Sequence, residues 1–179
     1  MGAAQGGDGF VVRPARHSDV QAVLDLFEEV AAEGRWIGAE APIDRELRLH
    51  QLSESIENKE GAVRYVADAD GSIVGHLWME LRPYGVADLG MLVAPDWRRR
   101  GVGSALMAAG IEWARSAGAH KVALQLWPHN QAALALYRKF GFQQEGLLRR
   151  HYPRRNGELW DALVMGLVLD EESPGSSLH

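Results

Sequence analysis

The sequence predicts an α/β fold of the α+β kind, in which about four helices flank one mixed, mostly antiparallel central sheet. Residues 62–81 carry the clearest β signal, because two runs rich in β-forming residues stand on either side of Asp70-Gly71, a typical hairpin turn. Residues 20–31 instead place apolar side chains at helical spacing. After residue 101 helical and strand patterns alternate, so we expect helices to lie against the faces of the sheet.

Most of the expected elements have a local signal at their start or end. Ser18, with Gln21 three residues later, predicts a capping box at the start of the first helix, and Asp44 can cap the second. A turn is indicated at residues 83–85, and Pro95 ends the strand that follows this turn. In chain order, the expected strands are residues 10–13, 62–68, 72–81, 86–93, 122–126, 142–150 and 159–169, and the expected helices are residues 18–33, 44–58, 101–118 and 130–140.

The composition indicates one globular domain. We expect this domain over residues 10–170, with the small, Gly-rich residues 1–9 and the Ser-rich residues 171–179 as flexible tails. No apolar run is long enough to span a membrane, and the N-terminus lacks the basic and apolar regions of a signal peptide. We therefore expect a cytoplasmic protein without a membrane partner. The chain has no cysteine and no metal-binding histidine spacing, so we also expect no metal.

The strongest local signal is RRRGVGS at residues 98–104, between an expected strand and an expected helix. Glycines there let the backbone approach a ligand closely, and free amides at a helix N-terminus favour a phosphate group. The arginines add positive charge. The dinucleotide pattern fails because Leu106 stands at the third glycine position, and the P-loop pattern fails because no G-K-[ST] follows. The segment predicts a phosphate cradle, with a simple Arg-rich turn as the alternative.

Two segments resemble the signatures of the GCN5-related N-acetyltransferase (GNAT) superfamily. LVAPDWRRRGVGSAL, residues 92–106, contains the acyl-CoA motif [Q/R]-x-x-G-x-[G/A] at Arg98, Gly101 and Gly103. NQAALALYRKFGF, residues 130–142, is similar to the second signature of the superfamily. One expected helix and one expected strand separate the two segments, as in that superfamily, and the resemblance covers about residues 10–169. It implies the GNAT fold and transfer of an acetyl group from acetyl-CoA to a primary amine of a small molecule or peptide.

The resemblance also implies site residues. By analogy, the backbone of residues 91–93 pairs with the pantetheine arm, and the amides of residues 99–104 hold the pyrophosphate. Asn130 lies near the thiol end, and Tyr137 protonates the departing thiolate, as a phenol within reach can do. The implied cofactor-binding residues are Met91, Leu92, Val93, Arg98, Arg99, Arg100, Gly101, Val102, Gly103, Ser104, Asn130 and Tyr137.

A base must also deprotonate the amine, and the resemblance implies a carboxylate on the central strands. Glu80 and Asp88 are the candidates, and a structural or solvent-facing role is the alternative for each. His76 alternates with Trp78 and Glu80 on one face of its strand, where packing is its alternative role.

The resemblance implies an acceptor pocket lined by the first two helices, their loop of residues 34–42 and the last hairpin. Trp36 can cover an amine there, and Glu33 is an acidic neighbour, although a hydrophobic anchor beside a solvated acidic face is the alternative. The basic residues 149–155 can meet an acidic substrate or the 3′-phosphate of coenzyme A, or form an exposed turn.

Two other function classes compete with the enzyme. A regulatory domain that binds acyl-CoA without turnover would keep the cradle, but Tyr137 argues against it. A nucleic-acid-binding module would use the arginines, but the net charge of −5 argues against a nucleic-acid partner. The resemblance further implies a homodimer.

Overall fold

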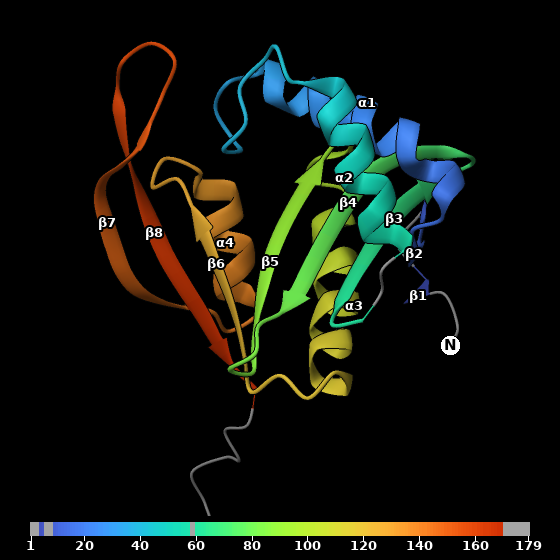
Figure 1. Cartoon of the computed structure of the whole chain (residues 1–179). Coiled ribbons are helices and arrows are strands. Elements are labelled where there is room, and N and C mark those ends of the chain that lie inside the picture. Colours follow the sequence, from blue (N-terminus) through green and yellow to red (C-terminus); the bar gives the residue numbers. More distant parts are fainter. Residues whose placement is uncertain (1–3, 6–8, 58–59, 170–179) are drawn as a thin grey trace, which may run out of the picture.

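The computed structural model describes residues 4–5, 9–57 and 60–169. Most of the residues assigned above to flexible tails lie outside this part, so that prediction stays untested. Within the described part, one eight-stranded sheet has the order β1-β2-β3-β4-β5-β6-β8-β7 (Figure 1). Its strands are β1 (Ala4–Gln5), β2 (Val11–Pro14), β3 (Ala62–Ala69), β4 (Ser72–Leu81), β5 (Val86–Val93), β6 (Lys121–Leu126), β7 (Gln143–Pro153) and β8 (Leu159–Val168).

The predicted mixed, mostly antiparallel sheet is confirmed, and its one parallel pair positions the site. Asp70 and Gly71 both have positive φ, as the tight turn between β3 and β4 requires. Strands β5 and β6 run parallel, and their register covers only residues 86–88 against residues 121–123. Beyond these three pairs the two strands are no longer hydrogen-bonded to each other. Their carboxyl ends are therefore free to line a ligand site.

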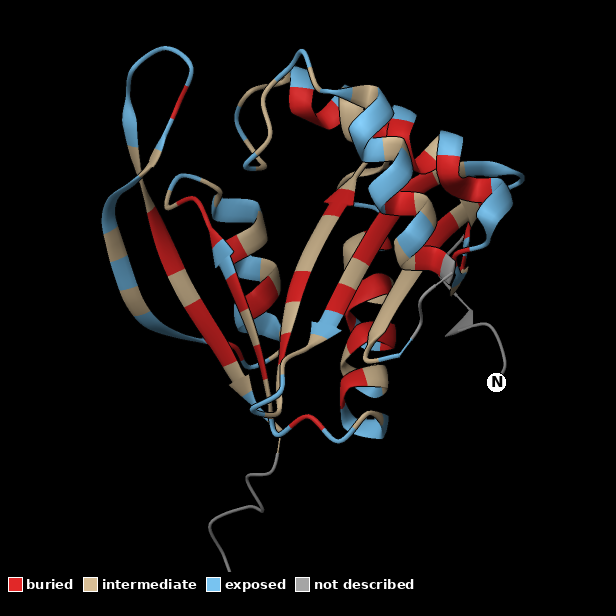
Figure 2. Cartoon of the chain, in the orientation of Figure 1, coloured by how far each residue is buried: buried red, intermediate tan, exposed pale blue. Residues whose placement is uncertain are grey.

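Helices cover both faces of the sheet. Helices α1 (Val20–Ala32) and α2 (Arg45–Glu57) lie on one face, in front in Figure 1, and α3 (Val102–Ser116) lies behind. Helix α4 (Gln131–Lys139) follows β6. Buried side chains line both central faces, whereas β7 at the sheet edge is largely exposed (Figure 2). Among the described residues, no helix is long and apolar enough to cross a membrane.

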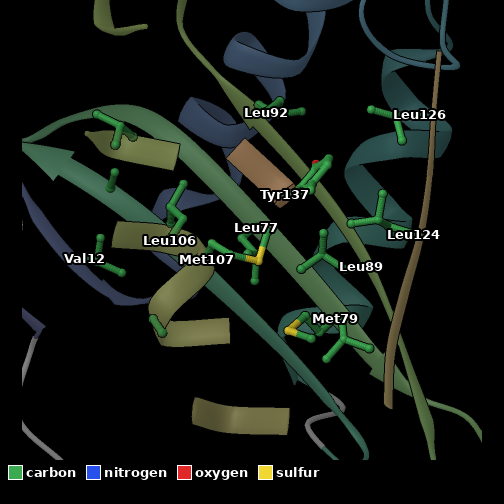
Figure 3. Packing of buried hydrophobic residues seen from close by; sticks show 14 of the residues in the cluster. Val12, Leu77, Met79, Leu89, Leu92, Leu106, Met107, Leu124, Leu126 and Tyr137 are labelled. Atoms are coloured by element: carbon green, nitrogen blue, oxygen red, sulfur yellow. The ribbon is translucent and has the colours of Figure 1, made fainter. Parts of the chain in front are cut away.

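The main core lies between the central strands and α3. Leu77 and Met79 of β4 are fully buried, as are Leu106 and Met107 of α3 (Figure 3). Gly110 lets α3 approach the sheet closely, because a Cβ atom there would lie 2.8 Å from the Met79 sulfur. Burial of each such side chain contributes about 1.5–3 kcal/mol. The central strands are therefore a rigid support for the residues at their ends.

The predicted capping box at Ser18 is wrong. Residues His17–Asp19 form a short 3₁₀ turn, and α1 begins at Val20. The buried Asp19 carboxylate accepts a hydrogen bond from the Arg16 amide and pairs with Arg13 at 2.7 Å. Because this carboxylate satisfies the entry to the helix, Ser18 is not needed as a cap. The second prediction is confirmed, since the Leu47 amide donates to Asp44 at 3.0 Å, one residue before α2.

Candidate active site

A cavity of about 1310 Å³ opens where β5 and β6 part. Residues 88–93 of β5 line it on one side and residues 123–127 of β6 and its following loop on the other. The first turn of α3, helix α4, residues 36–39 of the α1–α2 loop, and residues of α1, α2, β3 and β4 also line it. The cavity therefore joins the predicted cradle to the predicted acceptor side through the gap between two strands.

The cradle follows β5 and the 3₁₀ turn Pro95–Trp97. Gly101 has a φ of 85°, and a Cβ atom there would meet no atom within 4 Å. Conformation, rather than space, therefore favours glycine at this position. The first-turn amides of α3 lack intrahelical acceptors, and the helix dipole makes this end electropositive. Gly103 and Ser104 line the cavity next to them. This arrangement fits a phosphate group.

The three arginines do not act together. Arg98 forms an ion pair with Glu33, and its Nε atom donates to the Val93 carbonyl oxygen at 3.2 Å. Arg100 stacks over the Trp97 ring at 4.8 Å and, like Val102, is not among the residues that line the cavity. Arg99 lines the cavity. The backbone amides are thus the most direct phosphate ligands here.

Tyr137 and Asn130 come to the same cavity from α4 and its cap. Tyr137 is 7% exposed and packs on Phe142, with 5.6 Å between ring centroids. Figure 3 shows it in the same part of the core as Leu92 and Leu124. Burial raises the pKa of Tyr137 to about 12, so its hydroxyl keeps its proton at neutral pH. The Asn130 side chain accepts from the Ala133 amide at 3.2 Å and so caps α4, as the sequence predicts.

Glu80 and Asp88 face each other on neighbouring strands, where β5 still pairs with β6. Arg82 bridges them, with 3.1 Å to Glu80 and 2.6 Å to Asp88. Both carboxylates line the cavity. Asp88 stands four residues before Leu92, roughly 13 Å along the strand. The two candidate bases therefore lie toward the opposite end of β5 from the cradle.

The predicted acceptor residues lie beside the cradle, near the carboxyl end of β5. Trp36 lines the cavity, and its ring nitrogen donates to the Glu33 carboxylate at 2.7 Å. Glu33 also pairs with Arg98, which holds the pKa of its carboxyl below the usual value, and Glu33 is not among the lining residues. Glu33 therefore anchors Trp36 and the cradle to each other.

The last hairpin holds this loop in place. The Arg154 guanidinium lies over Trp160 and Trp127 and donates to the Gly38 carbonyl oxygen at 2.9 Å. Its side chain is 2% exposed. The interpretation of residues 149–155 as an exposed turn is therefore wrong for Arg154. An arginine flanked by aromatic residues was the signal available in the sequence, but the Gly38 carbonyl that it binds lies 116 residues away.

Sequence reasoning missed Arg64 of β3, which also lines the cavity. It shares a face of the sheet with His76 and Trp78, because Arg64 pairs with Trp78 in the β3–β4 register. His76 is 4% exposed, and burial, together with the Arg64 charge, lowers its pKa to about 3. In the sequence, the only signal for Arg64 was its charge between apolar neighbours in an expected strand.

A family model for the acetyltransferase (GNAT) family matches residues 23–142. The chain is 32% identical over 166 residues to the L-amino acid N-acetyltransferase AaaT of Escherichia coli K12. The matched region covers 88% of this chain and 97% of that protein. It is 28% identical to the L-methionine sulfoximine/L-methionine sulfone acetyltransferase of Pseudomonas paraeruginosa, over 89% and 94% of the two chains. The crystal structure of the ribosomal-protein-alanine N-acetyltransferase from Brucella melitensis superposes with a TM-score of 0.79 at 29% identity, covering 88% and 99%.

Proposed function

The chain belongs to the acetyltransferase (GNAT) family and is an acetyl-CoA-dependent N-acetyltransferase, and we propose that it acetylates a primary amine of a small molecule or peptide by direct attack in a ternary complex. The observation that carries the proposal is the continuous cavity between β5 and β6. The electropositive turn of α3 and the α1–α2 loop both reach this cavity near the carboxyl end of β5, where Glu33 pairs with Arg98. The two substrates can therefore meet in the gap.

The donor side uses mainly backbone groups. The parted edge of β5 offers residues 91–93 for pairing with the pantetheine arm, and the first-turn amides of α3 suit the pyrophosphate. Arg99 can add a charge contact, whereas Arg98 holds Glu33 and Arg100 stacks on Trp97. The side chains of Arg100 and Val102 do not line the cavity, so these residues can contact the cofactor only through their backbone groups.

The chemistry needs positioning and two proton movements. The amine nitrogen bonds to the thioester carbonyl carbon, and the carbon–sulfur bond then breaks. Tyr137 gives its hydroxyl proton to the departing sulfur and regains one from solvent; its pKa of about 12 keeps the phenol protonated until the thiolate forms. The acceptor ammonium gives up a proton beforehand, and a second proton leaves the nitrogen after attack. Glu80 and Asp88 are the carboxylates on the cavity wall that can take these protons through water.

The relatives carry enzyme names, which argues against the non-catalytic regulatory alternative. Their acceptors differ: one is named for L-amino acids, one for methionine sulfoximine or sulfone, and a structural neighbour for a ribosomal-protein alanine. A small amine and a peptide N-terminus thus both have precedent among them. The homodimer, the cytoplasmic location and the single domain over residues 10–170 remain predictions.

Calorimetric titration with acetyl-CoA tests the cofactor site. We expect micromolar binding by the natural chain and at least a tenfold loss in Gly103→Glu, whose side chain would enter the cavity beside the phosphate turn. Gly146→Glu is the matched control, because Gly146 has nothing within 4 Å of an added Cβ atom and lies outside the cavity lining. If the natural chain fails to bind acetyl-CoA, the proposal is wrong.

Thiol release tests the role of Tyr137. Tyr137→Phe keeps the ring on Phe142 but removes the proton, so we expect kcat to fall by about 10²-fold or more with an unchanged acetyl-CoA Kd. Tyr84→Phe, at an exposed turn, is the control that should keep full turnover. Equal turnover in Tyr137→Phe would remove this residue from the mechanism.

A further inference from the structure

Arg64 lines the cavity without an anionic partner, which distinguishes it from three other buried or partly buried arginines. Arg13 pairs with Asp19, Arg98 with Glu33, and Arg154 with Glu40. Among the side chains that the structure describes, which exclude that of Glu57, no carboxylate comes within ion-pair distance of Arg64. Burial lowers the pKa of Arg64, and Glu80 opposes this only at longer range.

The donor groups of Arg64 are only partly used. A guanidinium has five N–H donors. Its Nε atom donates to the Ser55 hydroxyl oxygen at 2.5 Å, and one terminal nitrogen lies 3.5 Å from His76 Nε2. Taking these two from five leaves three N–H groups without a partner among the described residues. Arg64 lines the cavity and is only partly buried, so these donors can be reached by an external acceptor.

His76 cannot supply the missing anion. Because arginine only donates, the contact requires that Nε2 of His76 be the unprotonated acceptor nitrogen. The low pKa of His76 agrees with a neutral ring. Arg48 of α2, stacked over Phe27 at 4.5 Å, brings a second cation to the lining of the same cavity. Arg64 and Arg48 together favour an anion here, because Arg82 pairs with the lining carboxylates Glu80 and Asp88.

The position of Arg64 matches a compact acceptor. Arg64, Trp78 and Gly90 form one cross-strand row on the face covered by α1 and α2. Adjacent strands are about 4.8 Å apart, so the Cα atoms of Arg64 and Gly90 are separated by roughly 10 Å. The Trp78 ring lies over Gly90, where a Cβ atom would come within 2.2 Å of the indole nitrogen. Gly90 directly precedes the segment that we propose for the pantetheine arm.

We infer that Arg64 binds the carboxylate of a free amino acid whose amine is the acetyl acceptor. This inference rests on the proposed function and deepens it. The planar fork of a guanidinium suits the two oxygens of a carboxylate. In an α-amino acid, one carbon separates the carboxylate from the amine, so the acid can meet Arg64 while the amine faces β5. A peptide N-terminus has an amide in place of this carboxylate and would leave the charge of Arg64 unmatched.

The test compares each standard L-amino acid with its own amide, with thiol release from acetyl-CoA as the readout. We expect kcat/KM to be about 10–100-fold higher for the preferred acid than for its amide, as one charged hydrogen-bonded contact provides. Arg64→Gln should reduce kcat/KM on the acid by a similar factor and leave the amide nearly unchanged. Arg64→Lys should recover part of the loss, and Arg115→Gln, on the exposed side of α3, is the matched control.

The outcomes separate the inference from the proposed function. Equal or better turnover of amides and simple amines would overturn the carboxylate site while leaving acetyl transfer intact. Failure to bind acetyl-CoA would refute the proposed function and this inference with it. An equal loss on acid and amide in Arg64→Gln, with a lower unfolding midpoint, would assign Arg64 a structural role and also overturn the inference. Retention of the midpoint, with loss on the acid alone, supports it.

Discussion

Acid should destabilise this protein in part through His76. The ring is buried beside Arg64, and its pKa of about 3 in the folded state compares with 6.5 for an ordinary histidine. The folded state therefore favours the neutral His76 ring. This preference stabilises the fold fully above pH 6.5, and the stabilisation is lost progressively as the pH falls toward 3. Linkage gives a loss of about 2 kcal/mol in the free energy of unfolding between pH 7.5 and pH 5.

Urea unfolding of the natural chain and of His76→Gln, at both pH values, measures this loss. The glutamine oxygen can still accept from Arg64 but takes up no proton in this range. We expect the variant to lose about 2 kcal/mol less than the natural chain between the two pH values. His50→Gln is the control, because the His50 side chain is 72% exposed. If the natural chain and His76→Gln lose equal stability, His76 is not held neutral and the reasoning is refuted.

Two further predictions concern the acceptor loop and the core. Arg154→Ala removes the hydrogen bond to the Gly38 carbonyl, so we expect faster thermolysin cleavage within residues 33–43 and about a tenfold higher acceptor KM; an unchanged cleavage rate would contradict this. Gly110→Val should lower the free energy of unfolding by about 2 kcal/mol, because α3 has no room for a side chain above Met79. Thermal denaturation checks the second prediction, with Gly146→Val as an unstrained control.

Local signals predicted most of the fold. The bounds of β4 and β5 agree with the sequence prediction, because alternating apolar side chains and a glycine-containing turn specify a strand and its end without distant partners. The predicted start of α1 was wrong because that start depends on distant partners and not only on the local sequence. Its entry depends on Asp19 and Arg13, and Arg13 also pairs with Asp68, which lies 55 residues away in the chain.

The candidate site likewise has parts that the local sequence specifies and parts that it does not. The glycine-rich turn before α3 and the cap of α4 are local, and the sequence identified both. The interaction partners of the charged side chains could not be predicted, because they depend on which residues the fold brings together. Arg98 is neutralised by Glu33, Arg154 is enclosed by aromatic rings, and Arg64 is left without an anion.

The sequence by itself determined the elements, the family resemblance and the cradle, because helix periodicity, turn residues and backbone conformation are properties of short segments. Only the tertiary structure decided where β5 and β6 part, which carboxylates share Arg82, and which arginines face the cavity without an ion pair. The physical reason is that ion pairing, burial and cavity shape depend on residues far apart in the chain. We therefore expect the acceptor preference to depend on charges that the fold leaves unpaired.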